Sequence, residues 1–232
     1  MKERDIYRFG FLCWNIQKRS LSAEFQHTFS HLLKNYRCDL IALQEVKVAH
    51  AGLPGHFQDY HTALSCNFER NGHRFGVMTL SRLPIAQKTL FTTKVREAGI
   101  ATRKSALLSR HTLHNGKRVA LLNLHAINFV PYRLFAKELN RIRELIESVE
   151  EESFIVAGDF NTWSAKRQRL LEKVTEKSNL VRLIPENSKD IKSILGRPLD
   201  HIYYRGLKAL SSIVIDTTVS DHNPIYARFS DG

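Results

Sequence analysis

The stretch Phe154-Ile-Val-Ala-Gly-Asp-Phe-Asn161 joins a short apolar strand to polar residues at the point where the strand stops. A run of four apolar residues closed by Gly158 is typical of a buried strand in a layered fold. Asp159 and Asn161 follow directly. Because a rigid sheet positions the side chains that follow its strands, this stretch predicts a functional site at a sheet edge.

The same pattern recurs at other strand ends. Polar residues follow or begin apolar runs at Asn15, Glu45, His125, Asp159 with Asn161, Asp200, and Asp221 with His222. One aspartate after a strand is most often a turn former or a helix cap, and one histidine is most often structural. The repetition of the pattern along the chain favours one shared active site.

Apolar periodicity predicts a chain in which strands outnumber helices. Helices are expected over the apolar stripe from Phe25 to Tyr36, over that from Phe135 to Val149, and at 165–177. Residues 50–73 are rich in Gly, His, Asn and Pro and predict loop with short strands. The other strands are expected at 9–16, 38–44, 75–81, 105–109, 118–125, 154–157, 199–204, 210–215 and 224–229. This pattern indicates an α/β fold with two sheets face to face and helices outside.

Length and composition favour one domain over residues 1–232, with the motifs between 9 and 229. The chain has 232 residues, 43% of them apolar, and no Pro- or Ser-rich linker. Its three cysteines, Cys13, Cys38 and Cys66, are odd in number and lack CxxC spacing, so neither a disulfide framework nor a zinc site is expected. No stretch approaches the roughly 18 apolar residues of a membrane span. We expect a cytoplasmic monomer without a membrane span.

The charge balance favours a polyanionic partner. The chain carries 35 Lys and Arg against 23 Asp and Glu, a net charge of +12. Nucleic acid is the first candidate and an anionic lipid surface the second, while a basic surface without such a partner stays an alternative. Residues 102–118 hold five basic residues and no acidic one. From this segment we expect Arg103 and Lys104 to bind substrate phosphate.

The candidate residues suit metal and histidine chemistry. Glu45 and Asn15 offer the hard oxygen ligands that Mg²⁺ prefers. Asp200 is a candidate acid to hold the tautomer of His222, which could then act as a general base toward water. A Ser-His-Asp hydrolase is disfavoured because the chain has no GxSxG motif. The absence of HExxH and GxxxxGK[ST] likewise disfavours a zinc protease and a P-loop enzyme.

Six short motifs carry a family resemblance. They are Trp14-Asn15-Ile16, Leu43-Gln44-Glu45-Val46, Asn123-Leu124-His125, Gly158-Asp159-Phe160-Asn161, Leu199-Asp200-His201-Ile202 and Ser220-Asp221-His222-Asn223-Pro224. Together they resemble the ordered motif set of the endonuclease/exonuclease/phosphatase superfamily, which includes deoxyribonuclease I. Further stretches, at 76–81, 104–107, 125–129 and 196–207, are similar to the bacterial YafD-like branch, which is defined by sequence and not by a substrate.

The resemblance implies a four-layered α/β/β/α sandwich with the active site in a cleft between the two sheets. It implies that Glu45 binds a catalytic Mg²⁺ or Mn²⁺ with Asn15 close by. Asp221 would support the metal or fix its own loop.

The resemblance also implies roles for the other candidates. His222, paired with Asp200, would activate or orient water. Asp159 and Asn161 would hold the nucleophile and the phosphate, and His125 would donate a hydrogen bond to a phosphate oxygen.

The resemblance leaves three substrate hypotheses. The first is a nuclease on DNA or RNA, supported by the net charge and by 44–50, which is similar to the metal-ligand stretch of deoxyribonuclease I. The second is a phosphatase or phosphodiesterase on a phospholipid headgroup or small phosphoester. The third is a non-catalytic binding module, which the complete motif set disfavours.

Overall fold

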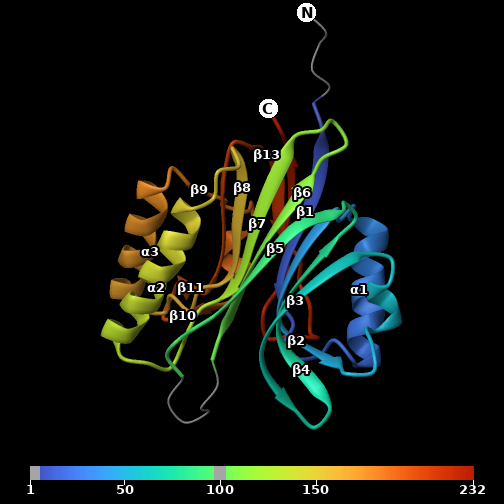
Figure 1. The fold of residues 1–232 in the computed structure, drawn as a ribbon, viewed down its shortest axis with the longest axis horizontal. Coiled ribbons are helices and arrows are strands. Elements are labelled where there is room, and N and C mark those ends of the chain that lie inside the picture. The colour runs from blue at the N-terminus through green and yellow to red at the C-terminus, as the bar shows by residue number, and fades with distance from the viewer. Residues whose placement is uncertain (1–5, 97–102) are drawn as a thin grey trace, which may run out of the picture.

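The computed structural model describes residues 6–96 and 103–232, in which two six-stranded sheets pack face to face between helices (Figure 1). The first sheet has the order β13 (Lys208–Val214), β14 (Ile225–Ser230), β1 (Arg8–Asn15), β2 (Leu40–Ala49), β4 (His73–Ser81) and β3 (His61–Arg70). The second has the order β5 (Ile85–Thr92), β6 (Ser105–Thr112), β7 (Arg118–His125), β8 (Ser153–Asp159), β12 (Asp200–Arg205) and β9 (Val181–Arg182). A separate hairpin pairs β10 (Ser193–Ile194) with β11 (Arg197–Pro198).

Three α-helices form the outer layers. Helix α1 (Ala23–Asn35) covers the first sheet, and α2 (Tyr132–Glu147) and α3 (Ala165–Lys177) cover the second (Figure 1). Short 3₁₀ turns lie at Gly55–Phe57 and Ser188–Asp190. The arrangement confirms the α/β sandwich that the apolar pattern predicts. In residues 6–96 and 103–232 no helix is long and apolar enough to cross a membrane.

Apolar side chains fill each interface between layers. Phe9, Phe11 and Phe229 pack between the two sheets, while Phe25 and Phe29 hold α1 on the first sheet. The second sheet is sealed by residues of α2 and α3, with Phe135, Leu139, Leu171 and Val174 buried. Burying apolar area of this extent is the main stabilising term, and it fixes the sheets that carry the site.

Strand direction brings the polar residues together. β1 runs parallel to β2, and β7 runs parallel to β8, so these strands end at the same edge of their sheets. His125 pairs in register with Asp159, which in turn lies opposite Asp200 at the start of the antiparallel β12. The topology therefore places these three residues side by side.

Two sequence expectations are wrong. The segment 50–73, predicted as loop with short strands, contains the ten-residue strand β3, and β5 was not expected. Both lie at sheet edges. Edge strands face solvent on one side and commonly carry polar residues, so their composition is close to that of a loop.

Glu45 does not end its strand as expected. β2 continues to Ala49, and Glu45 sits at an irregularity between Leu43 and Val46 with a φ of 53°. The backbone N–H of Lys18 donates to the Glu45 carbonyl at 2.8 Å. Bulges of this kind re-aim a side chain beside an active site, which here directs Glu45 to the cleft.

Candidate active site

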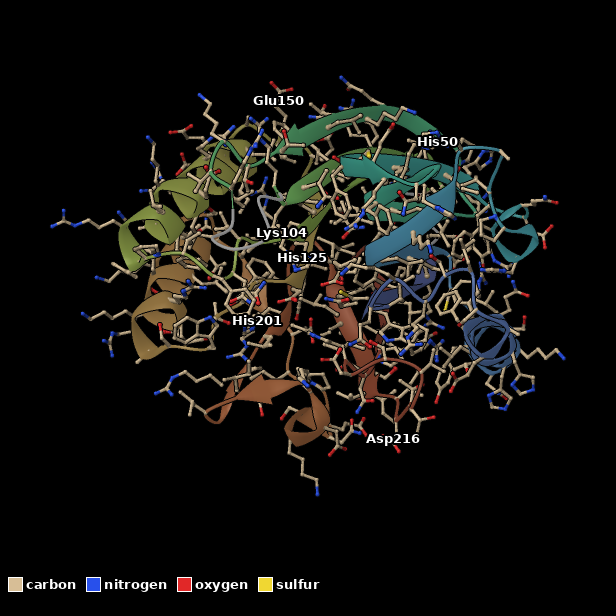
Figure 2. The ribbon with its side chains drawn as sticks, turned by 90° about the horizontal axis from the view of Figure 1, so that it is seen from below. His50, Lys104, His125, Glu150, His201 and Asp216 are labelled. Carbon is tan, nitrogen blue, oxygen red and sulfur yellow. The ribbon has the colours of Figure 1, made fainter. Side chains whose placement is uncertain are left out.

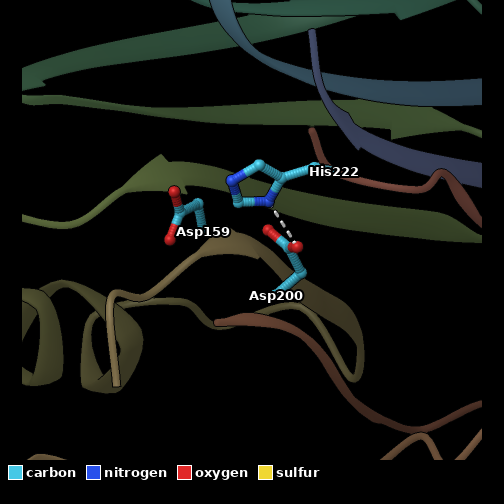
Figure 3. Close-up of side chains that lie close together, drawn as sticks. All are labelled: Asp159, Asp200 and His222. Carbon is cyan, nitrogen blue, oxygen red and sulfur yellow. Dashed lines mark hydrogen bonds and ion pairs between the residues drawn. The ribbon is translucent and has the colours of Figure 1, made fainter. Parts of the chain in front are cut away.

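A buried histidine and aspartate form the centre of the site (Figure 3). His222 Nδ1 lies 2.7 Å from Asp200 Oδ2, and both side chains are buried. Burial lowers the pKa of His222, but the charge and hydrogen bond of Asp200, with the charges of Asp159 and Asp221, outweigh it and raise the pKa to about 9. Asp200 therefore stabilises the protonated imidazole and fixes its orientation.

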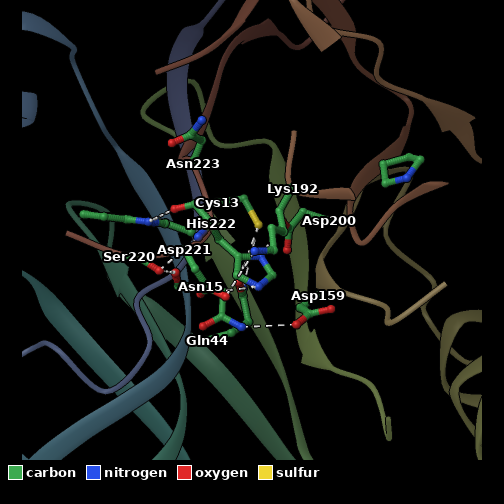
Figure 4. Close-up of polar contacts among 12 residues, drawn as sticks. Cys13, Asn15, Gln44, Asp159, Lys192, Asp200, Ser220, Asp221, His222 and Asn223 are labelled. Atoms are coloured by element: carbon green, nitrogen blue, oxygen red, sulfur yellow. Dashed lines mark hydrogen bonds and ion pairs between the residues drawn. The ribbon is translucent and has the colours of Figure 1, made fainter. Parts of the chain in front are cut away.

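The backbone around His222 is tied to the end of β1. The Trp14 indole Nε1 donates to the His222 carbonyl at 2.8 Å, and the His222 N–H donates to Ser220 Oγ at 3.2 Å. Ser220 Oγ in turn donates to the Asn15 carbonyl at 2.7 Å (Figure 4). Residues far apart in the chain thus hold the histidine loop against the first sheet.

Asp159 faces His222 from the second sheet. Its Oδ2 accepts from Asn15 Nδ2 at 3.1 Å, and its Oδ1 accepts from the Asn161 N–H at 3.0 Å (Figure 4). Burial, and then the charge of Asp200, raise the pKa of Asp159 to about 7. The site therefore concentrates negative charge that a cation could neutralise.

His125 forms the other wall of the site. Its Nε2 lies 3.4 Å from Asp159 Oδ2, 4.0 Å from Glu45 Oε1 and 3.0 Å from Lys104 Nζ (Figure 2). Burial, followed by the charge of Lys104, lowers the pKa of His125 well below its usual value. Glu45 Oε2 also pairs with Lys18 Nζ at 3.3 Å.

These side chains line a cleft of about 390 Å³. The predicted residues that reach it are Asn15, Glu45, Lys104, His125, Asp159, Asn161, Asp221 and His222. Asp200 lies behind His222. Asp221 is half-exposed and pairs with Lys192 Nζ at 3.3 Å, so it is tied to the cleft rim. The catalytic, phosphate-binding and metal-binding roles assigned from the sequence stay predictions.

Arg103 does not line the cleft. Its side chain is exposed, and its carbonyl accepts from Nδ2 of the cleft residue Asn67 at 2.6 Å. The phosphate-binding role expected of Arg103 stays a prediction. Two cations that the sequence analysis did not single out, Lys18 and Lys192, line the cleft instead. Lys18 follows β1 in a turn with a φ of 62°, which charge counting does not reveal.

The donor set suits a hard divalent cation. Asp159, Asp200 and His222 bring ligand atoms within 4.8 Å of one another. Asp200 Oδ2 is already engaged by His222, so the carboxylates of Glu45 and Asp159, with Asn15 bonded to Asp159, fit an ion better. Lys18 beside Glu45 shows that a positive charge is accommodated there. Oxygen ligands of this kind are those that Mg²⁺ and Mn²⁺ prefer.

Arg167 is a buried residue that does not line the cleft but supports its loops, and the sequence analysis missed it. Its guanidinium donates to the carbonyls of Asn161 at 3.1 Å, Asn128 at 2.6 Å and Val130 at 2.9 Å. It lies over the rings of Phe135 and Trp163, 4.3 and 4.5 Å from their centroids. In the sequence Arg167 is only one of several charges on an amphipathic helix, and such charges normally face solvent.

Comparisons with known proteins agree with this fold. The chain is 29% identical over 224 residues to a UPF0294 protein of Vibrio campbellii, covering 94% of this chain and 76% of the relative. An endonuclease/exonuclease/phosphatase from Beutenbergia cavernae has a similar fold, with a TM-score of 0.75 at 15% identity over 96% of this chain and 71% of that one. So does D. rerio TDP2 complexed with single-strand DNA product, with a TM-score of 0.64 at 16% identity over 96% and 98%. The model of the endonuclease/exonuclease/phosphatase family matches residues 12–222. The chain therefore belongs to the endonuclease/exonuclease/phosphatase family of phosphoester-hydrolysing enzymes.

Proposed function

We propose that this enzyme is a divalent-metal-dependent nuclease that hydrolyses a phosphodiester of DNA or RNA with water activated by His222. The observation that carries the proposal is the buried Asp200–His222 pair, which faces Asp159 across a cleft lined by lysines. In this proposal Asp200 is the acid that orients the base His222, and the cleft lysines supply positive charge for the phosphate.

Each residue has a defined task in this reaction. In its neutral form, whose share grows as the pH rises toward a pKa of about 9, His222 takes a proton from the attacking water while Asp200 stabilises the resulting imidazolium. Asp159 holds the water on the other side. A divalent ion held by Glu45, Asp159 and Asn15 would supply charge neutralisation at the phosphate.

Donors on the opposite wall complete the site. Lys104 Nζ and the His125 ring lie beside each other and stabilise the negative charge that develops on the phosphate oxygens. Their positions on β7 and next to β6 fix them relative to Asp159, so little reorganisation is needed.

A polyanionic substrate is supported by charge. The net charge is +12, and Lys18, Lys104 and Lys192 line the cleft. Binding of a phosphate backbone to such cations releases counterions and is independent of base identity. The structurally similar TDP2 holds a single-strand DNA product.

One observation favours a second candidate, a phospholipid phosphodiester. The β10–β11 hairpin beside the cleft exposes Ile194 by 40% and Leu195 by 77%. Exposed apolar residues next to an active site suit a lipid surface.

A substrate panel tests the proposal. Single-stranded DNA, RNA, plasmid DNA and phospholipid vesicles are incubated with Mg²⁺, Mn²⁺ or EDTA. We expect EDTA-sensitive cleavage of nucleic acid that His222→Ala and Glu45→Gln abolish without unfolding the protein, with Asp216→Asn as the exposed control. Turnover of lipid alone would move the function to the second candidate, and full activity of both site variants would refute the site.

A further inference from the structure

Phe129 exposes an aromatic ring at the catalytic cleft. It follows His125 by four residues, lines the cleft, and has 61% of its surface exposed. An exposed phenylalanine gains nothing from burial in the folded protein. Its position at the site therefore suggests that the ring contacts substrate.

The backbone on both sides of Phe129 is held in place. The carbonyls of Asn128 and Val130 both accept from Arg167 Nη2, at 2.6 and 2.9 Å. The Asn128 side chain also accepts from Trp163 Nε1 at 2.9 Å. Because Arg167 is buried, this attachment is to the core and not to a mobile surface group.

The same loop is bonded to the catalytic residues. The Ala126 N–H donates to the Asp159 carbonyl at 2.8 Å, and Asn161 Nδ2 donates to the Ala126 carbonyl at 2.9 Å. The backbone that carries Phe129 is thus held in place relative to Asp159. Only the side-chain torsions of the ring then have to be ordered when a planar group stacks on it.

Lysines and a stacked pair of phenylalanines line the same cleft as Phe129. Phe68 stacks on Phe75 with ring centroids 4.5 Å apart and planes at 6°, and both line the cleft with Lys18, Lys104 and Lys192. Aromatic faces interleaved with ammonium groups are the combination that binds unpaired nucleotides, because bases stack while phosphates meet the charges.

We propose that Phe129 is a stacking subsite for a nucleobase next to the scissile phosphate, so that the substrate is an unpaired strand. The inference rests on the proposed nuclease function and adds its substrate class. Bases of a duplex are already stacked on their neighbours, and extruding one is unfavourable. The cleft then discriminates by strand state and not by base sequence.

The test combines a change in the protein with a change in the substrate. Cleavage of a short single-stranded oligonucleotide is compared for wild type, Phe129→Ala and Phe129→Leu, with Leu134→Ala as the control, because Leu134 is exposed but does not line the cleft. A matched oligonucleotide series replaces one nucleotide at a time by an abasic analogue that keeps its phosphate. A duplex of the same sequence and thermal unfolding of each variant complete the set.

We expect Phe129→Ala to lower kcat/KM on the intact strand by roughly 5- to 150-fold, the range for loss of one base stack. The kcat/KM of Phe129→Leu should lie between those of wild type and Phe129→Ala, and that of Leu134→Ala should match wild type. On the oligonucleotide that lacks the stacked base, wild type and Phe129→Ala should cleave equally, and the duplex should be cleaved least.

Several results would overturn the inference. An equal loss for Phe129→Ala on every abasic oligonucleotide would show that the ring does not meet a base. Faster cleavage of the duplex than of the single strand would also refute it. If the wild type cleaves the strand but the effect of Phe129→Ala depends on no base, the nuclease proposal stands and the stacking subsite is refuted. A wild type that cleaves no oligonucleotide refutes both the nuclease function and the stacking subsite.

Discussion

At the scale of single residues, the hydrogen bond from His222 to Asp200 controls the protonation of the histidine. Asp200→Asn removes the charge that outweighs burial, so the pKa of His222 should fall from about 9. We expect kcat to drop by roughly 10²- to 10⁴-fold, because the imidazolium loses its counter-charge and its fixed tautomer. The pH–rate profile and an NMR titration of His222 measure both effects.

The control is Asp216→Asn, an exposed aspartate that lies away from the Lys104–His125 pair (Figure 2). An unchanged His222 titration in Asp200→Asn would contradict the assigned partnership.

Arg167 gives a second residue-scale prediction. Arg167→Met keeps the apolar stem but removes the described bonds to Asn161, Asn128 and Val130. Because those bonds hold the loops that follow β7 and β8, we expect a stability loss of about 2–4 kcal/mol and a lower kcat. Urea unfolding and steady-state kinetics measure these changes. Arg169→Met, on the exposed face of α3, should have neither effect, and a fully active Arg167→Met would refute the positioning role.

Site residues at strand ends could be predicted from the sequence, whereas residues that depend on tertiary contacts could not. Asn15, His125, Asp159 and Asp200 stand at strand ends, where local pattern marks them. Phe129 and Arg167 act through contacts with loops far along the chain. Exposure of a phenylalanine and burial of an arginine reverse the usual preferences, so sequence pattern alone could not identify them.

At the scale of elements, the parallel pairing of β7 and β8 depends on Gly158. This residue has a φ of +144°, and an added Cβ would lie 1.8 Å from the Leu124 carbonyl oxygen. Gly158→Ala should therefore destabilise the protein by more than the ~1–3 kcal/mol of backbone strain alone. Gly116→Ala is the matched control, because its φ is +82° with open space around it. Urea unfolding of both variants compares them, and equal losses would show that the close approach carries no penalty.

The central elements were predictable because they contain uninterrupted apolar runs, such as 119–122 in β7 and 154–157 in β8. The edge strands β3 and β5 were not, since half-exposed strands are stabilised by pairing with β4 and β6, which is a long-range property. The irregularity at Glu45 was hidden for the same reason.

At the scale of the whole molecule, buried neutral histidines predict acid lability. Burial lowers the pKa of His111 to about 4 and that of His201 to about 3, from 6.5. Between these folded values and 6.5 the unfolded chain binds more protons, so the free energy of unfolding falls as the pH is lowered through that window. The slope approaches roughly 1.4 kcal/mol per pH unit for each histidine.

Unfolding by urea between pH 7.5 and 4.5 measures this slope. His111→Gln should lower the slope of the unfolding free energy against pH by the contribution of one histidine. The exposed His27→Gln is the control. A slope that is the same in His111→Gln and wild type would assign the acid lability to other groups.

The tie between Trp14 and His222 spans 208 positions of the chain. β14, which is far along the chain from β1, lies between β13 and β1 in the first sheet. During translation β1 therefore waits without this neighbour until residue 230 has left the ribosome, and the Trp14 indole lacks the His222 carbonyl until residue 222 has been added. We therefore expect a chain cut short before residue 222 to lack both this tie and the His222–Asp200 pair, and so to be inactive.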